Sequence, residues 1–416
     1  MTASAGYAFP AHLFDCLQVN LAERADHWHG PGTALRLGAV LRFRPAPAVP
    51  SADASGLPTV ERTAVQQLDD ARRYLGLAVR SVDRGRPFGA VPPGEGRYVV
   101  ADAFLLPWVP YHRRQHMDHS FLLLPGEGGG VCVRDGYLND TPWGNARPGV
   151  WRLDRADLAD LETVGLSVDL APAEPSPLPP PVPVLDLAGE EETDGYVTAY
   201  EQHPDRIAAL RRLTLETWLL GRGRELHAAF LARYAVGGVS DRVREHVTAW
   251  KTLTEQVYLA YRRVERGRAE PVGPLGRLRE LLLADPRVFA RPDSNVVAAA
   301  GPDGTPTGTG RGLPGRGAGD PRAVIASVAA ETLGADPAAL LAGASLSELP
   351  EFNSFRIVEL VERLEERFRI EFRPDDLVPE NLHRVEDLHR AVERATPASP
   401  IPASPTLATA QAERTR

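Results

Sequence analysis

Two low-complexity stretches constrain the fold of this chain more than any other feature of its sequence. Residues 171–184 read APAEPSPLPPPVPV, a proline run typical of a semi-rigid extended spacer. Residues 301–320 read GPDGTPTGTGRGLPGRGAGD, which predicts a flexible linker. At 416 residues the chain is too long for one ordinary domain, so such breaks are expected to separate folding units. We therefore predict three domains, 1–170, 185–300 and 320–395, with a flexible linker at 301–319 and a flexible tail at 396–416.

Cysteine content and hydropathy exclude several classes of protein. The chain has two cysteines, Cys16 and Cys132, too few for a disulfide-stapled secreted scaffold or a cysteine zinc cluster. No apolar run reaches the length of a membrane span, and the N-terminus lacks a basic and then apolar signal pattern. His27 and His29 have no third ligand nearby in the sequence, so no metal site is predicted. We expect a cytoplasmic protein without a membrane partner.

Negative charge is concentrated towards the C-terminus. The formal net charge is −8, and residues 323–394 hold fifteen Asp and Glu residues against eight Arg, a net charge of −7. Because such a surface repels nucleic acid, no nucleic-acid partner is expected. The same surface suits docking to basic patches on protein partners.

This acidic region has the pattern of a small helical bundle. Amphipathic helices are predicted at 323–334, 354–368 and 384–395, and the stretch ASLSELPEF reads as a loop. A bundle of four helices in about 75 residues is predicted, of which these three ranges are the clearest. Asn353 is a suitable N-cap, which places Ser354 on the first turn with its hydroxyl in solvent.

The motif Asn353-Ser354-Phe355 and the stretch LVPENLHRVEDL resemble the acyl and peptidyl carrier proteins, whose usual motif is Asp-Ser-Leu. The resemblance covers residues 320–395. It implies a four-helix carrier bundle in which Ser354 holds a covalent 4'-phosphopantetheine arm. Free N–H groups and the positive helix end favour a phosphodiester at this position. Asn replaces Asp and Phe replaces Leu, so modification is expected to need a tolerant phosphopantetheinyl transferase.

The N-terminal region carries a candidate nucleophile. Cys16 precedes a helical run with Leu17, Leu21 and Ala25 on one face. A thiolate at a helix N-terminus is stabilised by the helix end, so a lowered pKa is expected for Cys16.

A predicted hairpin supplies a possible base for this nucleophile. The stretch RYVVADAFLLPW, residues 97–108, is predicted as a buried strand leading to a turn, and residues 119–140 as a hairpin turning near 126–129. His119 and Asp135 lie at the two ends of the hairpin, so the carboxylate is expected to reach and orient the imidazole. The chain order Cys, His, Asp is that of papain-like cysteine enzymes.

The residues Cys16, DAFLLP at 102–107, DHS at 118–120 and Asp135 resemble the N-terminal domain of the butirosin-pathway acyltransferase family, which is papain-like. That resemblance implies that an acyl group is moved from a carrier protein to an amine. Cys16 then attacks the thioester, His119 activates the thiol, and Asp135 orients His119. The resemblance also implies that the amphipathic helices of 185–300 correspond to the second domain of that family.

Together these features predict a multi-domain α+β protein: a papain-like N-terminal α+β domain, a helical middle domain and a C-terminal four-helix carrier bundle. The expected activity is carrier-dependent acyl transfer in natural-product or antibiotic biosynthesis, through Cys16 to a small-molecule amine acceptor. The expected protein partners are a phosphopantetheinyl transferase and an acyl- or amino-acid-activating adenylating enzyme. Two alternatives stay open: the triad hydrolyses or cyclises the thioester, or the N-terminal half is a non-catalytic docking scaffold for the carrier.

Overall fold

The computed structural model divides the chain into two compact units, each described by itself. The first unit consists of Met1–Tyr258 and Gly273–Gly315. The second unit consists of Leu259–Val272 and Arg316–Arg416. The described residues are 8–47, 55–84, 96–126, 131–153, 165–174, 178–235, 238–290, 320–349, 352, 354–373, 376 and 381–397. The predicted linker 301–319 lies outside them, as does the predicted tail except for Thr396 and Pro397. Helices and strands occur together, in agreement with the predicted mixed class.

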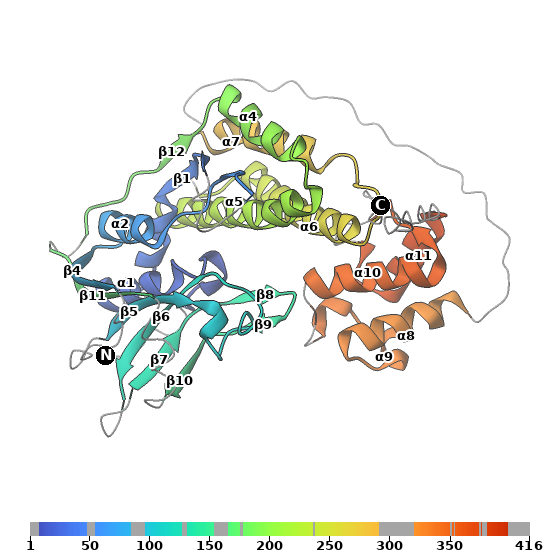
Figure 1. Ribbon diagram of the computed structural model, residues 1–416, viewed down its shortest axis with the longest axis horizontal. Helices are drawn as coiled ribbons and strands as arrows, with labels where there is room; N and C mark the ends of the chain where they lie inside the picture. The colour runs from blue at the N-terminus through green and yellow to red at the C-terminus, as the bar shows by residue number, and fades with distance from the viewer. Residues whose placement is uncertain are drawn as a thin grey trace, which may run out of the picture. The chain divides into compact units, whose positions relative to one another are not determined.

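The first unit contains a six-stranded antiparallel sheet, drawn below helix α5 in Figure 1. Its strands follow the order β10, β7, β6, β5, β11, β4. Their bounds are β4 Leu77–Arg84, β5 Arg97–Asp102, β6 Asp118–Pro125, β7 Val131–Asp135, β10 Gly149–Leu153 and β11 Gly165–Pro172. The central strands β5 and β6 are buried along almost their whole length, as expected for runs rich in Val, Tyr, Phe and Leu.

The predicted strand and hairpin are present. β6 and β7 pair antiparallel, with Leu122 opposite Arg134, while residues 127–130 of the predicted turn lie outside the described part of the chain. The predicted strand from residue 97 ends at Asp102, because the Asp102 side chain accepts the backbone N–H of Phe104 and caps a 3-10 turn. This turn, η3, covers Ala103–Leu105.

Helix α1, Val19–His29, packs against β6 and β11. The predicted apolar face is confirmed, because Leu17, Leu21 and Ala25 are all buried in the core of the unit. The neighbouring short elements are η1 Ala11–Leu13, η2 Thr33–Ala39 and α2 Ala64–Tyr74, the last of which begins with a capping box. Helix α1 contacts η2, and the Gln67 side chain of α2 donates to Asp15, next to the candidate cysteine.

Residues before 170 and residues 185–258, predicted as two domains, fall within this single unit. Helix α5, Arg206–Tyr234, packs against η2 and against β1, Val40–Phe43. The other elements here are α4 Glu190–Glu201, α7 Pro274–Phe289, β12 Val184–Leu187, β2 Ala46–Pro47 and β3 Pro58–Thr59. Helix α6, Asp241–Glu265, belongs to this unit up to Tyr258 and to the second unit from Leu259 onward. The proline-rich stretch begins in β11 and ends in β12, which pairs in parallel with β1.

The second unit contains the predicted C-terminal helices. They are α8 Pro321–Leu333, α9 Pro337–Leu341, α10 Ser354–Phe368 and α11 Val385–Arg394, with η5 Leu346–Glu348 and the short strands β13 Ile370–Glu371 and β14 Thr396–Pro397. Helix α8 contacts α9, α10 and α11. The buried residues of α8 include Ile325, Ala329 and Leu333, and Leu360 of α10 and Leu388 of α11 are buried as well. In the described residues of the chain, no helix is both long and apolar enough for a bilayer crossing.

Candidate functional site

Cys16 lies in the first turn that leads into α1. The Asp15 side chain accepts hydrogen bonds from the backbone N–H groups of Leu17 and Gln18, both at 2.8 Å, and its carbonyl accepts from Val19 at 3.1 Å. Asp15 therefore closes the turn that precedes α1, whose own N-cap residue is Gln18. Cys16 lies in this turn, before the helix begins at Val19, rather than in the first turn of the helix itself.

Strand β6 binds Cys16 on both sides of His119. The Cys16 thiol donates to the carbonyl of Asp118 at 3.4 Å, and the Ser120 hydroxyl donates to the carbonyl of Cys16. The Asn20 side chain adds a bond to the Ser120 carbonyl at 2.8 Å. Because Asp118 and Ser120 flank His119, these contacts bring the start of α1 to the part of β6 that carries the histidine.

His119 and Asp135 form a buried pair. Nε2 of His119 lies 2.7 Å from Oδ2 of Asp135, and their side chains are 0% and 3% exposed. The β6–β7 pairing ends with Leu122 opposite Arg134, so its continuation places Asp135 opposite Phe121. Phe121 is two residues after His119 on β6, and the two side chains share one face of the sheet. The pairing expected from the sequence is therefore diagonal across the two strands rather than directly opposite.

Further donors hold the Asp135 carboxylate in place. The Trp108 indole N–H donates to Oδ2 at 3.2 Å, and the backbone N–H of Tyr137 donates to Oδ1 at 2.9 Å. A carboxylate accepting three hydrogen bonds has little freedom to rotate. Trp108 and Tyr137 were not found from the sequence, although an Asp side chain often accepts the backbone N–H two residues later, as Asp135 does from Tyr137.

The environment of His119 selects one tautomer. A carboxylate only accepts, so Nε2 carries the proton and Nδ1 of the neutral ring carries the lone pair. Nδ1 is buried and has no hydrogen-bond partner among the described residues. The Tyr137 ring meets the imidazole edge-on, with ring centroids 5.2 Å apart. His119 is thus oriented as a base that has a free acceptor atom.

The predicted lowering of the Cys16 pKa is wrong. Burial raises the pKa of this thiol well above its ordinary value, and the negative charges of Asp15 and Asp135 raise it further. The thiol is 7% exposed, so the loss of hydration outweighs the stabilisation expected from the helix end. The cysteine therefore rests as a thiol and needs a base to become a nucleophile.

Arg222 of α5 forms hydrogen bonds to both chain segments that carry the candidate residues, the one before Cys16 and the one after Asp135. Its guanidinium donates to the carbonyl of Phe14 and, at 3.0 Å, to Oδ1 of Asn139, and it stacks on the Trp218 ring at 4.2 Å. Phe14 lies two residues before Cys16, and Asn139 lies four residues after Asp135. No sequence pattern points to Arg222, which comes from a helix about 200 residues away from the cysteine.

The segment 139–151, for which the sequence indicated no role, contains short strands. It forms the hairpin of β8, Asn139–Thr141, and β9, Gly144–Ala146, and then enters edge strand β10. Acyl transfer also needs a hydrogen-bond donor for the oxyanion, and from the sequence the Cys16 backbone N–H with an amide of Gln18 or His12 is a candidate. The Gln18 side-chain amide lies 3.4 Å from Oε1 of Gln67, and His12 is exposed.

The remaining candidates have ordinary structural surroundings. Cys132 is half-buried in β7 opposite Leu124, as its apolar strand suggested. His116 is exposed, pairs with Asp102 at 2.6 Å and stacks on Phe104. No cluster of three or more His, Cys, Asp or Glu residues suited to a metal ion occurs in the described part of the chain.

Ser354 belongs to the second unit and begins α10, as predicted. Its side chain and the predicted cap Asn353 lie outside the described residues. The first turn of α10 contains no acidic residue, so nothing there opposes a phosphodiester electrostatically.

No family model matches this chain, and no curated protein matches it.

Proposed function

We propose that this protein is a carrier-dependent acyltransferase in which Cys16 takes an acyl or aminoacyl group from a pantetheine thioester and passes it to an amine. The observation that carries the proposal is the oriented His119, whose Nε2 is bound to Asp135 and whose Nδ1 is buried without a partner. Cys16 is bonded to both neighbours of this histidine in the strand. A nucleophile, a base and an orienting carboxylate are the parts that acyl transfer needs.

The raised pKa of Cys16 favours general-base catalysis over a preformed thiolate. In the proposed reaction, Nδ1 of His119 takes the thiol proton as Sγ attacks the thioester carbonyl, and Asp135 stabilises the resulting imidazolium. His119 then returns the proton to the departing pantetheine sulfur, which leaves the acyl group on Cys16. When an amine attacks this acyl group, His119 takes the amine proton and gives it back to Sγ, so the free thiol is restored.

The second unit has the features that a carrier of the thioester requires. Ser354 starts a helix of 15 residues whose N-terminal N–H groups and positive end suit a phosphodiester. A phosphopantetheine group on Ser354 would supply the thioester, and an adenylating enzyme would load it. The four-helix arrangement, the papain-like character of the first unit and the cytoplasmic location belong to this proposal.

Trapping the acyl-enzyme tests the proposal. The purified Ser354→Ala chain is mixed with a set of acyl and aminoacyl N-acetylcysteamine thioesters, and peptides are analysed by mass spectrometry after acid quench. We expect an acyl adduct on Cys16 that is absent from Cys16→Ser and His119→Ala, with Cys132→Ala as the matched control. A chain that acquires no adduct on Cys16 from any thioester contradicts the proposal.

One observation favours a second candidate. Cys16 is nearly buried and its pKa is raised, as expected for a cysteine that serves only as a small apolar residue in a docking scaffold. In that case Cys16→Ala leaves every transfer reaction of the holo protein unchanged. If adducts form but water is the only acceptor, the hydrolase alternative is correct instead.

A further inference from the structure

Two glutamates of α10 are buried although they belong to the most acidic part of the chain. The side chains of Glu362 and Glu365 are 3% and 0% exposed. Burial raises the pKa of Glu365, so its charged form is held at a cost in free energy. A carboxylate in such a position needs cationic partners.

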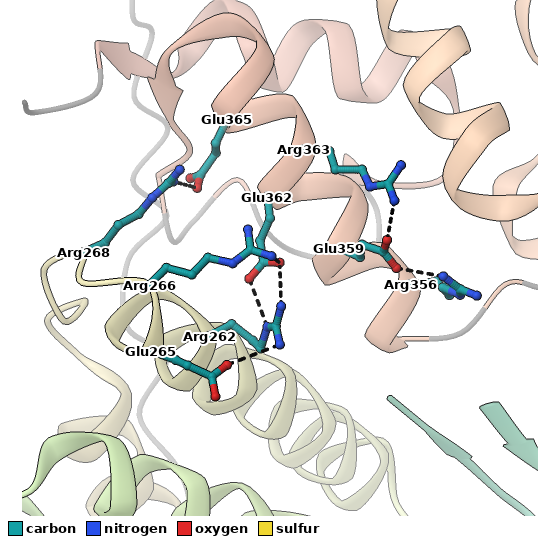
Figure 2. A network of polar contacts seen from close by, with 9 residues as sticks. All are labelled: Arg262, Glu265, Arg266, Arg268, Arg356, Glu359, Glu362, Arg363 and Glu365. Carbon is teal, nitrogen blue, oxygen red and sulfur yellow. Dashed lines mark hydrogen bonds and ion pairs between the residues drawn. The ribbon is translucent and has the colours of Figure 1, made fainter. Parts of the chain in front are cut away.

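The partners come from one short segment of the same unit (Figure 2). Arg262 and Arg266 pair with Glu362 at 3.3 and 2.7 Å. Arg263, which the figure does not draw, pairs with Glu365 at 3.1 Å. A further bond to Glu365 comes from Arg268. Four arginines within seven residues thus surround two acidic side chains.

The local geometry explains how Arg268 reaches the same acid as Arg263. Helix α6 ends at Glu265, and Gly267 adopts a left-handed conformation with φ of 72°. The backbone N–H of Arg268 then bonds to the carbonyl of Arg263 at 2.9 Å. Because glycine permits this reversal, the chain folds back and the two arginines converge on Glu365.

These contacts have the character of a docking surface. Buried ion pairs contribute little net stability, since desolvation offsets their attraction, but they fix geometry and select partners. The core of the bundle is supplied by apolar residues of its own helices, including Ile325, Leu340, Leu364 and Leu388. A third glutamate of α10, Glu359, forms its ion pairs within the same helix, with Arg356 and Arg363 (Figure 2).

We propose that residues 262–268 are a docking site for an acidic helix, and that the occupant is α10 of this same chain. The site selects its partner by charge and spacing: two carboxylates three positions apart on one helix face match two pairs of arginines. It follows that a basic protein directed at Glu362 and Glu365 must first displace this segment. The inference concerns the interface alone and does not require that Ser354 is modified.

Hydrogen exchange of the full-length chain, followed by mass spectrometry, tests this docking. In the variant with Arg262, Arg263, Arg266 and Arg268 changed to alanine, we expect peptides from 356–368 to exchange at least about tenfold faster. Arg363→Ala, which removes an exposed pair on the same helix, is the matched control and should leave the exchange unchanged. Unchanged exchange of α10 in the four-site variant overturns the proposal.

Two further measurements separate docking from a general loss of folding. Peptides from α8 and α11 should keep their protection in the four-site variant, because the bundle core remains; if they lose it as well, the segment is part of the folding core and the proposal fails. A synthetic peptide of residues 257–273 added to that variant should restore the protection of α10. The same peptide with glutamate at its four arginine positions should not, and equal effects of both peptides would count against charge recognition.

Discussion

His119 and Asp135 are joined by a 2.7 Å hydrogen bond from Nε2 to Oδ2, with both side chains withdrawn from solvent. Trp108 and the backbone of Tyr137 donate to the same carboxylate, so its orientation does not depend on the histidine alone. The bond determines which nitrogen of His119 is the base. It also places a negative charge where the imidazolium forms during proton transfer.

The first prediction concerns that charge. Asp135→Asn keeps an acceptor beside His119 but removes the charge, so the rate of Cys16 acylation should fall by about 100-fold or more. Single-turnover mass spectrometry with an acyl thioester measures this rate. The control is His116→Ala, because His116 and Asp102 form a second His–Asp pair that is exposed. Equal losses in the two variants would show that Asp135 has no special role.

The second prediction concerns the ionisation of Cys16. Since burial, Asp15 and Asp135 raise the pKa of the thiol, iodoacetamide should alkylate Cys16 slowly at pH 7 and faster only above the free-thiol pKa of about 8.5. The measurement is peptide mass spectrometry of Ser354→Ala across pH, with the unfolded chain as the reference for a solvated cysteine. Rapid alkylation of the folded chain at pH 6 would show a preformed thiolate and contradict the raised pKa.

The same pKa shift has a consequence for stability. A group whose pKa is raised on folding stabilises the fold below its unfolded value, and this contribution is lost as pH rises through the folded value. Above about pH 8.5 the Cys16 thiol ionises in the unfolded chain first. The free energy of unfolding should therefore decline in alkaline solution more steeply for the wild type than for Cys16→Ala, which has no proton to lose there.

The third prediction concerns Arg222. Replacement by alanine removes the hydrogen bonds to Phe14 and Asn139, so we expect a loss of about 1–3 kcal/mol in unfolding free energy and slower acylation of Cys16. Arg222→Lys keeps the positive charge but cannot make both hydrogen bonds. Compared with Arg222→Ala, it should therefore restore more of the unfolding free energy than of the acylation rate. Arg211→Ala, an exposed change on the same helix, is the control. Full acylation by Arg222→Ala would exclude a positioning role.

Local sequence patterns were sufficient for the parts of the site that depend on neighbouring residues. The helix that follows Cys16 is indicated by apolar periodicity, and the His119–Asp135 contact by the two ends of a hairpin. The sign of the Cys16 pKa shift was missed because it depends on burial and on Asp15, Asp135 and other acids brought together by folding. Arg222 was missed because nothing in its own helix indicates which distant carbonyl it will bind.

The helices and strands were predicted better than their grouping. Apolar spacing indicated α10 and its start at Ser354, but the proline-rich stretch was interpreted as a spacer between domains. In the structure this stretch is bound to the first unit, where Arg36 donates to the carbonyl of Pro179 at 2.6 Å. Composition alone cannot distinguish an extended segment in solvent from one that crosses a surface, because the hydrogen-bond donors lie far away in sequence.

The last prediction tests whether η2 and α5 pack as closely as one compact unit requires. A Cβ added at Gly38 would lie 2.4 Å from the carbonyl oxygen of Leu226 and 2.8 Å from Cβ of Phe230. His227 reinforces this approach by donating from Nδ1 to the Gly38 carbonyl at 2.6 Å. Gly38→Ala must therefore push the two segments apart, and we expect it to lower the free energy of unfolding by about 1–3 kcal/mol.

Gly223 on α5 is the matched control, because a Cβ added there meets no atom within 4 Å. Alanine is the better helix former, so Gly223→Ala should raise the free energy of unfolding by about 0.5–1 kcal/mol. Urea denaturation of both variants gives the two values. If Gly38→Ala is as stable as the wild type, η2 and α5 are not in this contact in solution, and the helical region would then be a separate domain, as the sequence suggested. Opposite signs for the two alanines indicate that the N-terminal region and α5 share one core.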